Sequence, residues 1–189
     1  RDYFRHGVLH ILGGYDHLLF IAALVLATVT LWDLVKIVTA FTLAHTLTLT
    51  LAVLDVVRLP SSIVEPMIAA SIVFVAVENV LRPDRSRGPG RLMIAFAFGL
   101  FHGLGFAGGL LDAMAGMTGA AVGLAIVAFS AGVELGHQLI VVPVFGILRL
   151  AERSRADELG RARIYAAALR YGSAIISVAG LVYLIAALG

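Results

Sequence analysis

The chain has 189 residues and a mass of 19.9 kDa, the size of one ordinary domain, but 60% of its residues are apolar and only 14% are charged. A soluble domain of this size has too few interior positions to bury so many apolar side chains, so we exclude a soluble enzyme, a nucleic-acid-binding protein and a disordered tail. We attribute the net charge of +2 to the excess of basic residues that membrane proteins carry in their cytoplasmic loops. The absence of cysteine excludes disulfides, thiolate metal sites and cysteine nucleophiles.

Six apolar segments follow one another along the chain, and each is close to the roughly 20 residues that a helix needs to cross the hydrocarbon core of a bilayer. They cover residues 7–30, 36–56, 61–81, 91–113, 118–148 and 163–188. We therefore expect an all-α, polytopic membrane protein in which residues 1–189 form a single domain, a bundle of about six transmembrane helices.

Basic residues are concentrated in two of the loops between these segments, and such loops face the cytoplasm. The loop after the third segment and the loop after the fifth lie on the same side of a six-span chain, so we expect both termini on the extracytoplasmic side of a bacterial inner membrane. Because the chain begins with Arg1, we also expect that an N-terminal leader or extracytoplasmic segment has been removed. The basic residues of the two loops are Arg82, Arg85, Arg87 and Arg91, and then Arg149, Arg153, Arg155, Arg161 and Arg163.

The first segment carries three histidines and an aspartate. At about 100° per residue, His6, His10 and His17 lie within a narrow arc of one helix, with Asp16 beside them. An ionised side chain at the bilayer centre costs about 2.5–3.5 kcal/mol on insertion scales, so such residues indicate function by default. We expect this stripe to lead from the outer surface to a metal ion, with Asp16 as a ligand or as a group that orients an imidazole.

Later segments add further ligands of the same kind. His45 lies near the middle of the second segment and His102 near the middle of the fourth. In the fifth, Glu134 and His137 form the Glu-x-x-His pattern that metal-binding helix bundles project into their cores. With the expected topology these residues reach similar depths. The predicted metal ligands are His10, Asp16, His17, His45, His102, Glu134 and His137.

Other polar residues are candidates for a cation pathway. An acid in the first turn of a helix, such as Glu65, is favourable whatever its function, and Glu78 can pair with Arg82 four residues later or serve as a polar exit. Threonine hydroxyls in a span usually bond the helix backbone. Ser71 is a possible hydroxyl nucleophile in principle, but we expect it to serve helix packing. The possible pathway residues are His6, Thr42, Thr46, Glu65 and Glu78.

Four short motifs resemble those of a known family. The first is the segment His10-Ile11-Leu12-Gly13-Gly14-Tyr15-Asp16-His17-Leu18-Leu19-Phe20, and the others are FTLAHT at 41–46, FGLFHG at 98–103 and VELGH at 133–137. In these motifs, and in their order over essentially the whole chain, the sequence resembles HupE/UreJ proteins. Ile11 stands where the best-known members have proline, which places the chain in a side branch. The resemblance implies a nickel permease for metal uptake across an inner membrane.

Two main functions are compatible with these residues. Imidazoles and carboxylates without thiolates suit Zn, Ni, Co or Fe. The first hypothesis is a permease for a divalent transition metal of the nickel/cobalt type. The alternative is an intramembrane zinc-dependent hydrolase acting on a lipid or peptide bond, with an open metal position for water. A metal-sensing or accessory protein is a third option. The expected partners are the lipid bilayer, the metal ion and a second copy of the chain, because one small bundle has few gating elements.

Overall fold

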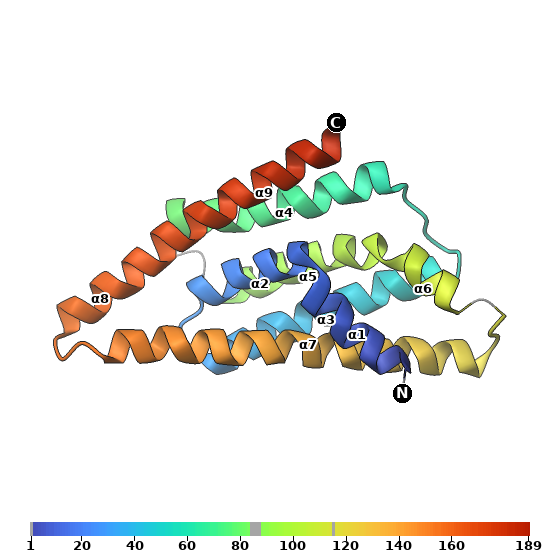
Figure 1. Ribbon diagram of the computed structural model, residues 1–189, viewed down its shortest axis with the longest axis horizontal. Coiled ribbons are helices and arrows are strands. Elements are labelled where there is room, and N and C mark those ends of the chain that lie inside the picture. The colour runs from blue at the N-terminus through green and yellow to red at the C-terminus, as the bar shows by residue number, and fades with distance from the viewer. Residues whose placement is uncertain (1, 84–87, 115) are drawn as a thin grey trace.

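A computed structural model describes residues 2–83, 88–114 and 116–189, and over these ranges it contains helices and no strands, as predicted (Figure 1). Arg1 and two arginines of the predicted basic loop, Arg85 and Arg87, lie outside the described residues. The helices are α1 (Asp2–Gly13), α2 (Tyr15–Ala27), α3 (Leu31–Val53), α4 (Ser61–Leu81), α5 (Pro89–Gly105), α6 (Ala107–Ala113), α7 (Ala120–Arg153), α8 (Glu158–Ala167), the π-helical turn η1 (Ala168–Gly172) and α9 (Ser173–Leu188).

Four helices of the described chain are long and apolar enough to cross a membrane: α3, α4, α7 and the helix over residues 158–188 that joins α8, η1 and α9. Helices α1 and α2 make a fifth if the bent pair counts as one span. The predicted segment 91–113 is divided between α5 and α6. With 17 residues, α5 is about 25 Å long, shorter than a hydrocarbon core of about 30 Å. The chain is therefore a multi-pass membrane protein.

The predicted continuous helix over residues 7–30 is wrong, because the chain breaks at Gly14. Gly14 has extended backbone angles (φ −86°, ψ 93°), and the axes of α1 and α2 meet there at 71°. Adjacent glycines favour such a break because they resist helix formation. His6 and His10 consequently lie on one helix and His17 on the next, so the three do not form a stripe on a straight helix.

The second span begins earlier than predicted, at Leu31 instead of residue 36. Thr30 caps this helix, since its Oγ1 accepts a hydrogen bond from the backbone N–H of Asp33 (3.1 Å). Lys36 forms an ion pair with Asp33 on the exposed surface of the first turns. The polar residues that suggested a loop therefore form the capped start of α3. For the third span, the predicted range 61–81 coincides with α4.

Three pairs of helices pack with their backbones in contact, α1 with α7, α3 with α5, and α4 with α9 (Figure 1). A Cβ atom on Gly7 would overlap the carbonyl oxygen of Phe129, and one on Gly132 would overlap that of Phe4. At the α3–α5 contact, a Cβ on Gly103 would overlap the carbonyl oxygen of His45. Small residues allow this approach, which adds van der Waals contact that lipid-exposed helices otherwise lack.

Two apolar cores lie on either side of a polar layer. One core surrounds α2 and includes Phe41 and Val141, and the other lies beside α1 and α6 and includes Leu49 and Val133. His45 lies between Phe41 and Leu49 on α3, and His137 lies between Val133 and Val141 on α7. The fold therefore places a layer of histidines between two hydrophobic clusters.

Candidate metal centre

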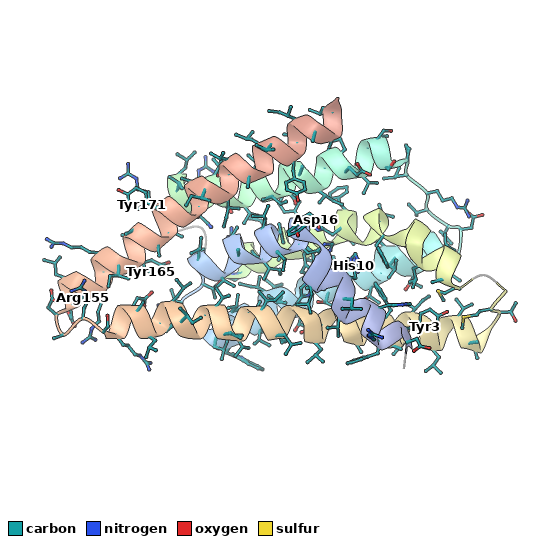
Figure 2. All side chains as sticks on the ribbon, in the orientation of Figure 1. Tyr3, His10, Asp16, Arg155, Tyr165 and Tyr171 are labelled. Carbon is teal, nitrogen blue, oxygen red and sulfur yellow. The ribbon has the colours of Figure 1, made fainter. Side chains whose placement is uncertain are left out.

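Five imidazoles from five different helices meet in this layer, and we call them the histidine layer: His10 (α1), His17 (α2), His45 (α3), His102 (α5) and His137 (α7). His17 is at the centre of the layer. Its ring centroid lies 4.8 Å from that of His10, 4.9 Å from His102, 5.8 Å from His45 and 6.4 Å from His137. Four of the five side chains are buried, and His10 is partly buried. Figure 2 shows His10 and Asp16 near the bend between α1 and α2.

Two groups of ligand atoms in the layer are close enough to share an ion. Those of His10, His17 and His45 lie within 4.8 Å of one another, as do those of Asp16, His17 and His102. Imidazole nitrogens bind zinc at about 2.0–2.1 Å, so ligands on opposite sides of an ion are about 4 Å apart. The separations are therefore close to those of a metal site, and His17 belongs to both groups.

The hydrogen bond between Ser71 and His102 determines which nitrogen of His102 keeps a lone pair free to bind a metal ion. The Ser71 hydroxyl donates its only proton to the carbonyl oxygen of Ile68 (2.6 Å), so its oxygen accepts from Nε2–H of His102 (3.0 Å). The lone pair of His102 is then on Nδ1. This atom is buried and has no hydrogen-bond partner among the described residues.

His137 and His17 have the same arrangement. Thr42 on α3 donates to the carbonyl oxygen of Val38 (3.2 Å), and its oxygen therefore accepts from Nδ1–H of His137 (3.1 Å). The Asp16 carboxylate accepts from Nδ1–H of His17 (3.1 Å) and also from its backbone N–H (2.8 Å). Both imidazoles keep a buried Nε2 that lacks a partner in the described part of the chain. A second oxygen group that binds the far nitrogen is typical of metal-ligating histidines.

The two remaining imidazoles also present buried nitrogens. Both ring nitrogens of His45, and Nε2 of His10, have no partner within the described ranges. A buried polar group without a hydrogen bond costs about 1–3 kcal/mol. A cation would satisfy several of these nitrogens at once, so the donor set of the layer fits a divalent transition metal.

Aromatic rings that no sequence pattern assigned to the site surround the layer. The Phe41 ring lies 5.0 Å from His102 and 5.6 Å from His137, and Phe20 lies 5.0 Å from His102 on the side of the larger core. On the other side Phe106 lies 4.0 Å from His10. These rings limit the access of water to the imidazoles, which strengthens electrostatic interactions within the layer.

Glu134 is one turn from His137 but has other partners. Its Oε1 accepts hydrogen bonds from the hydroxyl of Thr39 (2.8 Å) and from the amide of Gln138 (2.9 Å). Glu134 is absent from the ligand groups found among the described residues, although its Oε2 is buried without a partner there. The structure therefore places Glu134 beside the layer, at the contact between α3 and α7.

The predicted pathway residues are distributed over the molecule. His6 is exposed near the N-terminus, with its ring 6.3 Å from that of Tyr3. Glu65 is exposed and lines a pocket that also includes Asp16. Thr46 donates to the carbonyl oxygen of Thr42 within α3, which is ordinary helix back-bonding.

Glu78 lies in a buried polar network near the C-terminal end of α2, the end away from His17. It forms an ion pair with Arg91 (3.0 Å), whose side chain is fully buried. Arg91 also donates to Asn79 (2.7 Å) and to the carbonyl oxygen of Ala23 (3.3 Å). Arg91 is therefore not the loop charge predicted from the sequence: it stands in the first turn of α5 and binds the C-terminal half of α2.

The chain belongs to the HupE/UreJ family. The model of that family, described as HupE / UreJ protein, matches residues 1–187, nearly the whole chain. The comparison with curated proteins and the comparison with solved structures each gave no match.

Proposed function

We propose that this HupE/UreJ protein is a permease for a divalent transition metal of the nickel/cobalt type, and that the cation crosses the bilayer through the histidine layer. Membership of the family supports metal transport. The residues assigned to the cation are His10, Asp16, His17, His45, His102 and His137, with Glu134 as a carboxylate beside them. Imidazole and carboxylate ligands without thiolates suit Ni²⁺ or Co²⁺.

One observation carries this proposal: three imidazoles of the layer bind an oxygen group through one nitrogen and leave the other buried and open. These pairs are Asp16 with His17, Thr42 with His137 and Ser71 with His102. A histidine whose only role is helix packing needs no open nitrogen, whereas a ligand must present a lone pair to the ion.

The proposed topology has about six spans in a bacterial inner membrane, with α1 and α2 as one bent span and α5 with α6 as another. The arginines at the end of α7, in the α7–α8 connection and on α8 mark the cytoplasmic end. They are Arg149, Arg153, Arg155, Arg161 and Arg163. Figure 2 shows Arg155 at that end, far from Tyr3 near the N-terminus. Both termini are then extracytoplasmic.

The test is uptake of Ni²⁺ or Co²⁺ into proteoliposomes that contain a metal-responsive fluorophore. We expect uptake by the natural chain and its loss in His17→Ala. The control is Tyr15→Ala, which removes an exposed ring from the same turn of α2 and leaves the layer unchanged. Purified protein that retains stoichiometric zinc and gives no flux of either metal would overturn the permease proposal and favour the zinc hydrolase.

A further inference from the structure

A pocket of about 270 Å³ opens between α2, α4 and α9 and reaches Asp16, which is hydrogen-bonded to His17 of the histidine layer. Its walls are mostly apolar, with Ile68 and Ile72 from α4 and Ala186 from α9 among them. Asp16 and Glu65 are the two charged residues that line it. A cation in this pocket therefore meets two carboxylates and few other polar groups.

Asp16 lines the pocket and is also hydrogen-bonded to His17 of the histidine layer. Its side chain is 31% exposed, while the imidazole of His17, to which it is hydrogen-bonded, is 3% exposed. Asp16, His17 and His102 form one of the ligand groups, and the open nitrogens of the two imidazoles are buried. Asp16 thus joins an accessible cavity to buried ligand atoms.

Glu65 occupies the part of the pocket near the start of α4. Ile68 and Ile72 follow it at i+3 and i+7, so the three residues lie along one face of the helix. Glu65 is exposed, whereas Ile68 and Ile72 are buried. This face of α4 therefore leads from an exposed carboxylate into the interior of the bundle.

We propose that this pocket is the entrance for the metal ion, with Glu65 as the first carboxylate that binds the hydrated cation and Asp16 as the group that passes it to His17 and His102. This inference rests on the proposed permease function. Two carboxylates between low-dielectric walls raise the local concentration of a divalent cation. Asp16 stands in the first turn of α2, whereas the buried ion pair of Arg91 with Glu78 lies near the other end of that helix.

The absence of cysteine from the chain makes a direct test possible, because one introduced cysteine is the only thiol. Ala186→Cys places it on the pocket wall at an exposed position of α9. The matched control, Ala120→Cys, places it at the exposed start of α7, outside the residues that line the pocket. Both variants in proteoliposomes are treated with a membrane-impermeant, positively charged methanethiosulfonate, and Ni²⁺ uptake is measured before and after treatment.

We expect the reagent to lower Ni²⁺ uptake by Ala186→Cys at least about ten-fold, through steric block and like-charge repulsion, and to leave Ala120→Cys unchanged. Glu65→Gln should raise the Ni²⁺ concentration for half-maximal uptake and leave the Co²⁺ absorption spectrum of the layer intact. Full uptake by labelled Ala186→Cys, with labelling confirmed by mass spectrometry, would overturn the proposal that this pocket is the entrance. An absence of uptake by the unlabelled variants and the natural chain would instead overturn the permease function.

Discussion

The imidazole rings of His10 and His17 lie 4.8 Å apart, centroid to centroid, although six residues separate them in the chain. On a straight helix, residues seven positions apart are separated by about 10 Å along the axis. The 71° bend at Gly14 removes this separation. The break in the helix therefore brings these two imidazoles together.

Gly14→Ala should weaken metal binding. A Cβ on Gly14 would lie 2.9 Å from the carbonyl oxygen of His10, 3.1 Å from Oδ1 of Asp16 and 3.1 Å from Nδ1 of His17. Either the bend or the Asp16–His17 hydrogen bond must shift, and we expect Co²⁺ affinity to fall about 10–100-fold, the usual effect of disturbing a group that orients a ligand. Isothermal titration calorimetry of the variant in detergent measures this Co²⁺ affinity. Gly13→Ala is the control, because its Cβ would have no neighbour within 4 Å.

Ser71→Ala should lower metal affinity although Ser71 is not itself a predicted ligand. Without the hydroxyl, Nε2–H of His102 loses its acceptor, and the ring is no longer held in one tautomer. We expect a loss of about 10–100-fold in Co²⁺ affinity with a small change in Tm. Ser71→Thr keeps the hydroxyl and should recover part of the affinity. Equal affinity in Ser71→Ala and the natural chain would show that His102 does not bind the ion.

Thr42→Val tests whether the hydroxyl that binds Nδ1 of His137 likewise supports metal binding by that imidazole. The substitution removes the hydroxyl that accepts from Nδ1–H of His137 and keeps the shape of the side chain. Metal affinity should fall, whereas Thr46→Val, which loses only a bond to the carbonyl oxygen of Thr42, should bind as the natural chain does. If both variants bind the metal equally well, His137 lies outside the site.

Arg91→Met should destabilise the fold. It leaves the carboxylate of Glu78, Oδ1 of Asn79 and the carbonyl oxygen of Ala23 without this donor in a buried region. Removing one partner of a buried pair costs about 3–5 kcal/mol, which thermal unfolding in detergent should report as a lowered Tm. The control is Arg58→Met, whose ion pair with Asp55 is 67% exposed on both sides and should contribute about 1 kcal/mol or less. The double variant Arg91→Met with Glu78→Gln should recover part of the loss.

The sequence predicted the helices well where one apolar run has clear polar ends. The range 61–81 was found because polar residues and Pro60 precede it and Arg82 follows. The bend at Gly14 was missed because the apolar pattern continues through it, although the Gly13-Gly14 pair was a local signal. The start of α3 was placed too late because Asp33 and Lys36 stand in its capped first turns.

For the site, the sequence indicated the residue types and the structure supplies their partners. Placing a histidine in an apolar segment costs free energy in the bilayer, so these residues could be selected as candidates without knowing how the helices pack. Ser71 and Thr42 could not be assigned to imidazoles in this way, because each contact joins helices that are far apart in sequence. The burial of Arg91 likewise depends on Glu78 and the end of α2, which no local pattern reveals.

The glycine contacts have a consequence for how the bundle can move. Close backbone contact at these glycines resists sliding of one helix along the other, so we expect each of the three pairs to move as one unit. His45 lies on α3 and His102 on α5, so we expect these two to move together. We expect His10 to move with α7, whereas His17 follows the bend at Gly14 and lies outside both pairs. For the permease that we propose, we expect alternating access by rotation of these pairs about α2, which would change the neighbours of His17.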